Sequence, residues 1–296
     1  MNGVVVIDKP QGLTSHDVVN HVRRILGQRS VGHLGTLDPS ATGVLPIVLG
    51  SFTRLAQFYL RSEKKYEGVI RFGFATDTYD ADGEPMSVPQ NVLLRLEDVR
   101  ALAAEFQGTI KQMPPPFSAK KIAGVPAYKL ARKHKEVRLE PVQVEVKEFV
   151  ILNVADDRAM FRAHVGSGTY LRSVAHEMGQ KLGCGAHLAG LRRTAVAEFV
   201  IEEAHTLEEL ESAARQGSAE DLFIHPRKLL PHMPSVTANE ESVALIRSGR
   251  AVNLPEMSRA PLVKVFCGQT KLIAIATRVA GTLFHPGIVF GASGGS

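Results

Sequence analysis

The order of the apolar runs along this chain constrains its fold more than any other feature. Residues 65–73 alternate between inward-facing apolar side chains, including Tyr66, and charged ones, which is the two-residue period of a half-buried strand. Residues 142–147 repeat the alternation, and several strand-like runs follow one another without a helical pattern between them. This order predicts an α+β fold with a mixed, largely antiparallel central sheet rather than a doubly wound parallel one.

Helices are expected to flank this sheet. Thr14 and Asp17 have the spacing of a capping box, with Asp in place of the usual Glu, and apolar residues follow at helical spacing until Gly27. Residues 97–106 form a second amphipathic pattern. A third helix is predicted from the apolar stripe at residues 171–182, which places Arg172 in its first turn.

Two domains are expected. At 296 residues the chain exceeds the usual size of one compact core. Residues 230–234 contain two prolines and are typical of a linker. Beyond them the sequence predicts a helix at 239–249 and short strands at 263–266 and 271–277. We therefore predict a large domain at 1–230 and a small β-rich domain at 231–296.

Composition narrows the class of protein. Hydrophobic residues make up 44% of the chain, enough to fold without disulfides or a structural metal. The two cysteines are too few for a disulfide framework and fit a reducing cytoplasm. No export signal is evident, and no apolar run approaches the roughly 18 residues of a membrane span. A net charge of +5 favours a polyanionic partner.

Residues 32–46 are the strongest candidate for chemistry. Three glycines and two prolines exclude a helix or a central strand there, and Pro39 biases Asp38 toward an extended backbone. The segment is thus a shaped loop that displays one carboxylate. A tight turn in which Asp38 binds nearby amides would explain the same residues, and both interpretations stay open. A nucleotide-binding loop is excluded, because the segment has neither a P-loop ending nor a Gly-x-Gly-x-x-Gly motif.

The position of Arg172 needs an explanation, because a cation in the first turn opposes the positive end of the helix dipole. A nearby anion would stabilise Arg172 there, whereas a solvated side chain is the alternative. A buried carboxylate partner would decide between the two.

No metal site is expected. The Asp-x-Asp-Gly pattern at residues 80–83 has Thr78 and Pro89 at the first and last ligand positions of a calcium loop, and neither supplies the carboxylate required. Gln180 stands where a zinc-binding His-Glu-x-x-His helix needs its second His.

Six stretches of the chain carry a family resemblance. They are 2–17 (NGVVVIDKPQGLTSHD), 31–46 (VGHLGTLDPSATGVLP), 76–83 (TDTYDADG), 114–130 (PPPFSAKKIAGVPAYKL), 167–173 (SGTYLRS) and 183–194 (GCGAHLAGLRRT). Together they resemble the bacterial tRNA pseudouridine-55 synthases of the TruB family. Six spaced motifs agree by chance far less often than one short motif. The resemblance implies a pseudouridine synthase fold with a small PUA-like, RNA-binding C-terminal domain, which matches less strongly.

The resemblance implies three catalytic residues. Asp38 matches the family's catalytic aspartate, and Arg172 matches the arginine that pairs with it. Such a pair lowers the pKa of a carboxylate by about 1 to 3 units, so an ionised Asp38 is expected. Tyr66 resembles the residue that stacks on the target uracil, a contact worth roughly 1 to 3 kcal/mol in comparable sites. Removal of the C5 proton by Tyr66 is a further hypothesis.

Other matching residues are expected to line the pocket or contact the RNA. Leu34 departs from the family, which usually has a small or polar residue there. The matches are His33, which resembles the side chain that fills the place of the flipped nucleotide; Tyr170, a site-lining hydroxyl; Leu191, an apolar wall; Asp80, a polar member of the pocket; and Lys9 and Pro10, which resemble structural residues.

A basic patch is expected to contact phosphates, with Arg192 and Arg193 adding to it. A solvated face is the alternative for each residue taken singly. The stretch 114–141, which contains the patch, resembles an insertion that closes over the T loop in the family. The patch consists of Lys120, Lys121, Lys129, Arg132 and Lys133.

The resemblance implies an isomerase that needs no cofactor. Uracil 55 in the T loop of tRNA would leave its ribose, turn, and rejoin it through C5. Asp38 could attack C1′ of the sugar or C6 of the base, or act as a base toward the ribose, and these routes stay open. A non-catalytic tRNA-binding or RNA-folding protein and a glycosylase that releases uracil are the alternatives. The expected partner is the T stem-loop of tRNA, without a membrane or an obligate protein partner, and a cytoplasmic monomer suffices.

Overall fold

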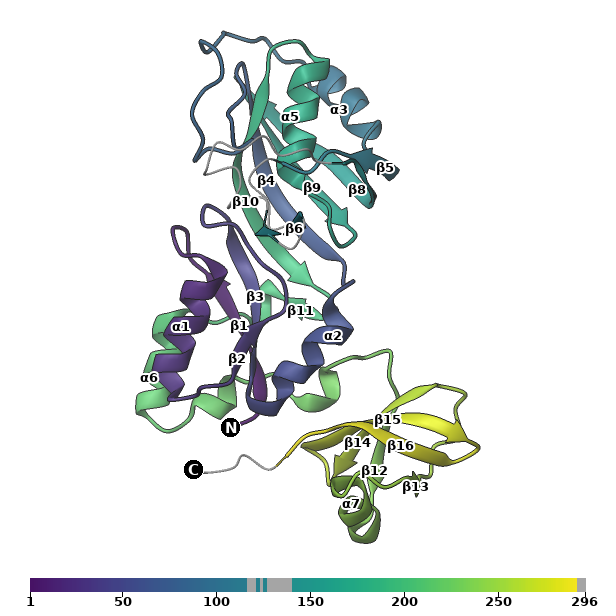
Figure 1. Cartoon of the computed structure of the whole chain (residues 1–296). Helices are drawn as coiled ribbons and strands as arrows, with labels where there is room; N and C mark the ends of the chain where they lie inside the picture. Colours follow the sequence, from purple (N-terminus) through teal and green to yellow (C-terminus); the bar gives the residue numbers. More distant parts are fainter. Residues whose placement is uncertain (116–120, 123–124, 127–139, 292–296) are drawn as a thin grey trace.

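The computed structural model describes residues 1–115, 121–122, 125–126 and 140–291 of the chain (Figure 1). Within these ranges the main feature is a nine-stranded sheet in the order β1-β3-β10-β4-β9-β8-β5, with β2 paired to β3 and β11 to β10. The strands are β1 (Gly3–Lys9), β2 (Val31–His33), β3 (Thr42–Leu49), β4 (Lys64–Phe72), β5 (Gly108–Gln112), β8 (Val142–Ala155), β9 (Arg158–Val165), β10 (Ala186–Val196) and β11 (Phe199–Val200).

The strand directions confirm the predicted fold class. Among the described pairs of this sheet, only β3 and β10 run parallel, and all the others are antiparallel. The alternating segment around Tyr66 is β4, and the alternation at 142–147 opens the longer β8. The fold is therefore α+β with a mixed, largely antiparallel sheet, as the sequence predicts.

Helices cover the sheet in two groups (Figure 1). Helices α3 (Leu96–Ala104) and α5 (Leu171–Lys181) pack on the half of the sheet that contains β8 and β9, around Phe149 and Phe161. Helices α1 (Ser15–Leu26) and α6 (Leu207–Arg215) pack beside β1 and β3 in a separate core. The site described below lies where the two halves meet.

The predicted capping box starts α1. The Thr14 hydroxyl accepts the Asp17 amide at 3.0 Å, and the Asp17 carboxylate accepts the Thr14 amide at 2.9 Å. Two of the amides at the helix start thereby gain partners, so the chain turns from β1 into a helix at the predicted residue. Gly27 ends the helix with φ +58°, a conformation that Gly adopts without strain.

A smaller five-stranded sheet follows the expected linker and lies next to α2 (Ala56–Tyr59) in Figure 1. Its strand order is β12-β14-β15-β16-β13, and α7 packs on it through Ile246. The domain boundary at residue 230 stays a prediction. The elements are β12 (Ser235–Ala238), α7 (Glu240–Arg247), β13 (Val252–Asn253), β14 (Leu262–Cys267), β15 (Lys271–Ala280) and β16 (Leu283–Val289).

The two sheets share an apolar contact. The rings of Phe52 and Phe290 meet edge to face with centroids 5.0 Å apart, and Arg54 donates to the carbonyl of Val289 at 3.0 Å. One cluster of buried side chains runs through both parts, so the small sheet is packed against the large one.

The expected RNA-closing insertion falls mostly outside the described residues, apart from the short strands β6 (Lys121–Ile122) and β7 (Val125–Pro126), which pair with each other. Among the helices that the structure describes, none combines the length and the apolar character needed to cross a membrane.

Candidate active site

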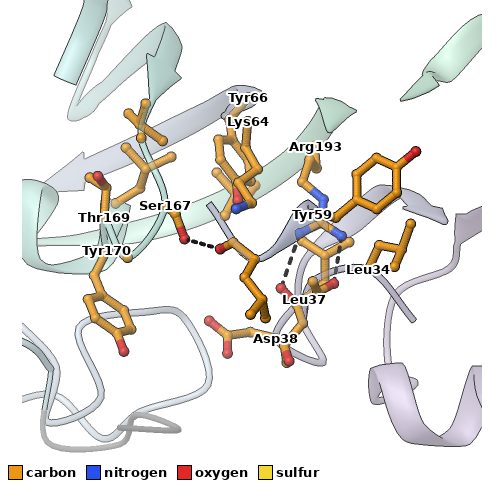
Figure 2. Close-up of a pocket in the computed structure, with 18 of the residues that line it drawn as sticks. Leu34, Leu37, Asp38, Tyr59, Lys64, Tyr66, Ser167, Thr169, Tyr170 and Arg193 are labelled. Atoms are coloured by element: carbon orange, nitrogen blue, oxygen red, sulfur yellow. Dashed lines mark hydrogen bonds between the residues drawn. The ribbon is translucent and has the colours of Figure 1, made fainter. Parts of the chain in front are cut away.

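An open pocket of about 330 Å³ lies between the loop after β2, the start of β4, the turn before α5 and strand β10 (Figure 2). Its volume is at the small end of the range for ligand sites. The sequence-predicted residues that line it are His33, Asp38, Tyr66, Tyr170, Arg172 and Leu191. Six residues from four separate segments of the chain thus meet in one cavity.

The loop that carries Asp38 is held on both sides of that residue. The Ser15 hydroxyl receives the Leu37 amide at 2.8 Å and donates to the Leu37 carbonyl at 3.1 Å. On the other side, the Gly12 amide donates to the Pro39 carbonyl at 2.8 Å. Because these contacts fix both neighbours of Asp38, the carboxylate projects from a backbone that has little freedom.

Lys9 contributes to the same support. Its side chain is 0% exposed, and its ammonium donates to the carbonyls of Pro10, Leu13 and Pro39 at 2.8, 2.7 and 3.2 Å. Burial lowers the pKa of Lys9 to about 8, an effect that the nearby Asp38 partly opposes. The role of Lys9 in the structure is therefore to tie the β1 turn to the Asp38 loop.

Arg172 reaches Asp38 from the first turn of α5. Its Nε lies 3.1 Å from Oδ2 of Asp38, and the Arg172 side chain is only 7% exposed. Arg172 therefore has a carboxylate partner and is not a solvated side chain. The turn before α5 is fixed by the buried Gln112, whose amide group accepts from the Tyr170 N–H at 2.8 Å and donates to the Tyr170 carbonyl at 3.1 Å.

The expected direction of the Asp38 pKa shift is wrong. Burial raises the pKa of the Asp38 carboxyl, and the negative charges of Asp80 and Asp82 raise it further. Arg172 opposes this rise but does not reverse it. The sequence-based expectation counted the arginine and omitted the loss of water around the carboxylate, which disfavours its charged form.

Tyr66 stands on the opposite wall from the Asp38 loop. It is directly across from Arg193 in the antiparallel pairing of β4 with β10, so the two side chains lie on the same face of the sheet. Figure 2 shows both in the pocket, with Lys64 beside Tyr66. The pocket therefore has an aromatic ring on one side and a carboxylate on the other.

Comparisons with known proteins identify the family of this chain. The family described as "TruB family pseudouridylate synthase (N terminal domain)" matches residues 23–171, and "tRNA pseudouridylate synthase B C-terminal domain" matches residues 172–233. The tRNA pseudouridine synthase B of Solibacter usitatus is 50% identical over 292 residues, which cover 98% of this chain and 100% of that protein. The chain belongs to the TruB family of pseudouridylate synthases.

Other relatives extend the similarity. The tRNA pseudouridine synthase B of Dehalococcoides mccartyi is 37% identical over 290 residues, covering 98% of this TruB family member and 97% of that protein. A solved H/ACA RNP bound to a substrate RNA containing 2′-deoxyuridine contains a chain with TM-score 0.72 and 26% identity. A solved Cbf5–Nop10–Gar1 complex contains a chain with TM-score 0.71 and 27% sequence identity. Each match covers 98% of this chain and 85% of the other, so the fold similarity includes the small C-terminal sheet.

In this TruB family member, Asp80 is the second carboxylate near Arg172. Its Oδ2 lies 3.3 Å from Nη1 of Arg172, while its Oδ1 accepts from the Thr78 hydroxyl at 2.6 Å and the Asp82 amide at 3.2 Å. Asp80 is 7% exposed and does not line the main pocket. It lines an adjoining cavity together with Asp38, Arg172 and Leu191, and its predicted role as a polar member of the pocket stays a prediction.

His33 and Leu34 are neighbours in the loop that lines the pocket. Burial lowers the pKa of His33, and the charge of Arg193 adds to the effect, so the imidazole favours its neutral form. Leu34, which departs from the family pattern, is 4% exposed and packs in the core shared by the two sheets. Leu34 also lines the pocket, so the departure lies both in this core and at the pocket wall.

Several predicted RNA contacts cannot be compared with the structure. Lys120, Lys129, Arg132 and Lys133 lie outside the described residues, as does the side chain of Lys121.

The two arginines expected to add to that patch have other partners. Arg192 forms a two-pronged pair with the Asp8 carboxylate at 3.0 and 2.7 Å. Arg193 is 1% exposed, so it has no surface with which to contact a phosphate, and that expectation was wrong.

Among the lining residues to which sequence reasoning gave no place in the pocket are Tyr59, Lys64 and Arg193. Arg193 had a usable signal, because it is two residues after the expected pocket wall Leu191 on one strand and shares its face. Lys64 stands at the same spacing before Tyr66. Tyr59 gave no local signal, since it comes from the short helix α2, which precedes β4.

Proposed function

We propose that this protein isomerises a uridine of tRNA to pseudouridine, at position 55 of the T loop, with Asp38 as the catalytic carboxylate. The observation that carries the proposal is the 3.1 Å pair of Arg172 and Asp38 at the edge of a pocket that Tyr66 also lines. The TruB family membership and the names of the relatives support tRNA as the substrate.

The reaction makes no net demand on a cofactor. The N1–C1′ bond breaks, a C5–C1′ bond forms, the C5 proton leaves and N1 gains a proton, so all atoms of the nucleotide are retained. What the protein must supply is a base taken out of the RNA stack, a fixed orientation and one reactive carboxylate. Tyr66 is proposed to stack on the uracil, and Arg172 to orient Asp38.

The surrounding residues are assigned in the same way. His33 is proposed to take the place of the flipped base, a steric role that suits an imidazole whose pKa is lowered. Tyr170 and Leu191 are proposed to bound the uracil, and Asp80 to hold Arg172. The basic residues of the stretch 114–141 are proposed to bind phosphates of the T stem-loop.

The domain organisation is part of the proposal. Residues 1–230 are assigned to catalysis, with residues 114–141 closing over the RNA, and residues 231–296 to a PUA-like RNA-binding domain. The proposed partner is the T stem-loop of tRNA, the proposed location the cytoplasm, and the proposed working form a monomer.

Tritium release from C5-labelled uridine in a T-stem-loop RNA tests the proposal. The wild-type protein is expected to release tritium without forming free uracil, and Asp38→Asn is expected to bind the RNA and release none. Free uracil would instead indicate a glycosylase. RNA binding without release by either protein would leave a binding or folding role and overturn the proposal.

A further inference from the structure

Arg193 is a buried cation in the wall of the pocket. It is 1% exposed, and among the described residues no carboxylate forms an ion pair with it or is a main cause of its pKa shift. Burying a charge is costly unless hydrogen bonds compensate for the lost water. The partners of this guanidinium are therefore informative.

Those partners are three backbone carbonyls around the Asp38 loop. Nη2 donates to Gly35 at 3.0 Å and Nη1 to Thr36 at 3.1 Å, both shortly before Asp38. Nε donates to Val44 at 2.8 Å, on the far side of the loop. Because a guanidinium is planar and rigid, one group fixes the two ends of the loop relative to each other.

Burial lowers the pKa of this guanidinium, and the Tyr66 side chain opposes that effect, so the two groups lie close together. The register explains this contact, since Arg193 and Tyr66 face each other on β10 and β4. Arg193 thus touches the aromatic wall and the carboxylate-bearing loop at once. Lys9, another buried cation near Asp38, donates to three backbone carbonyls instead.

The backbone of Arg193 leaves little room for adjustment. It pairs with Gly43 of β3, where an added Cβ would lie 2.2 Å from the Arg193 carbonyl oxygen. Gly43 has φ +101°, a conformation that other residues rarely adopt. The side chain of Arg193 therefore starts from a fixed point between two closely paired strands.

We propose that Arg193 is a positioning residue that fixes the Tyr66 ring relative to the Asp38 loop. This inference rests on the proposed function. A uracil stacked on Tyr66 meets Asp38 in a reactive geometry only if the distance between ring and loop is fixed, and a displacement of 1 Å can lower a rate about 100-fold. Arg193 acts through both groups without touching the substrate.

Arg193→Lys tests this role, because lysine keeps the charge but presents a single point where the guanidinium presents a fork. The single-turnover rate on bound T-stem-loop RNA is expected to fall about 100-fold, while the dissociation constant for the RNA changes less than about 3-fold. A residue that only stabilises the core would lower both the rate and binding in proportion to the unfolded fraction.

Lys264→Met is the matched control. Lys264 is also 1% exposed, and its ammonium donates to the carbonyls of Arg227 and Leu229, away from the pocket. It is expected to lower the Tm while leaving the single-turnover rate unchanged. Arg193→Gln, which is neutral and smaller, replaces Arg193→Lys if the lysine variant does not fold.

Hydrogen exchange gives a readout that does not depend on activity. Amides of residues 34–41 and 64–68 are expected to exchange faster in Arg193→Lys and at the wild-type rate in Lys264→Met. An inactive wild-type protein would contradict the proposed function. The hydrogen-exchange rates would still decide whether Arg193 fixes the Tyr66 ring relative to the Asp38 loop. The positioning role would be overturned if Arg193→Lys exchanged both segments at the wild-type rate, or if its single-turnover rate equalled that of the wild type.

Discussion

The Nε atom of Arg172 lies 3.1 Å from Oδ2 of Asp38, and the arginine is the more deeply buried partner, at 7% side-chain exposure against 43%. The pair joins the first turn of α5 to the loop after β2. On its other side Arg172 contacts Asp80 at 3.3 Å. One guanidinium therefore lies between two carboxylates, of which only Asp38 lines the main pocket.

Arg172→Lys is expected to lower the single-turnover rate of isomerisation by on the order of 100-fold, with a smaller effect on RNA binding. A lysine ammonium is a point charge and does not keep the orientation that the guanidinium imposes on Asp38 through Nε while it holds Asp80 through Nη1. Tritium release from labelled stem-loop RNA measures the rate.

Lys181→Arg, on the last turn of the same helix, is the control for that variant. Lys181 pairs with Glu105 at the surface, away from the pocket, and exposed pairs contribute little. A wild-type rate for Arg172→Lys would mean that Asp38 requires only a positive charge and not the geometry of the guanidinium.

Asp82→Asn is expected to move the acid limb of the kcat/KM profile to lower pH. Asp82 raises the pKa of Asp38 by like-charge repulsion, so its removal lowers that pKa. If the ionised form of Asp38 reacts, activity is lost as pH falls through the Asp38 pKa, and a lower pKa keeps the protein active at lower pH. The rate on the neutral plateau should not change.

Glu84→Gln is the control for the pH profile, because Glu84 is exposed on the same loop and is not among the main causes of the Asp38 pKa shift. A shift of the limb to higher pH in Asp82→Asn, or an equal shift in both variants, would contradict this account of the Asp38 environment.

The sequence was sufficient for features that depend on local patterns. The capping box at Thr14 and the strand alternation around Tyr66 are properties of neighbouring residues, and both appear at the predicted positions. The grouping of Asp38, Tyr66 and Arg172 was expected from motif resemblance. Neither spacing nor propensity alone would have brought these three elements together.

The features that were predicted wrongly from the sequence depend on burial. The direction of the Asp38 pKa shift follows from how much water the folded chain removes, and Arg193 was misjudged because a basic residue next to Arg192 was taken as exposed. Strand alternation would have corrected the assignment of Arg193, since adjacent residues of a strand face opposite sides of the sheet. Desolvation has no comparable local signal.

Tyr66→Phe and Tyr66→Leu separate the ring of Tyr66 from its hydroxyl. Phe keeps the face on which the uracil is proposed to stack but loses the contact with Arg193, whereas Leu loses the stacking, worth roughly 1 to 3 kcal/mol. Leu is expected to weaken RNA binding, and Phe to keep binding and slow the step that releases tritium. A Phe variant with an unchanged chemical step would exclude the hydroxyl from C5 proton removal.

Gly43→Ala is expected to destabilise the protein by about 3 kcal/mol or more, because it adds two separate costs. The backbone at φ +101° is strained for alanine, and the new Cβ would lie 2.2 Å from the carbonyl oxygen of Arg193. Gly108→Ala isolates the first cost, because Gly108 has φ +89° and nothing within 4 Å of an added Cβ. Its expected loss is about 1 kcal/mol.

Urea unfolding of the two alanine variants measures the difference. A gap of about 2 kcal/mol would mean that β3 and β10 cannot move apart at Gly43, since an added Cβ meets the Arg193 backbone there and meets nothing at Gly108. The isomerisation rate should then fall in Gly43→Ala and not in Gly108→Ala, because a displaced Arg193 backbone carries its guanidinium away from the Asp38 loop. Equal losses of stability would instead mean that the strands separate at little cost, and that the close pairing does not anchor Arg193.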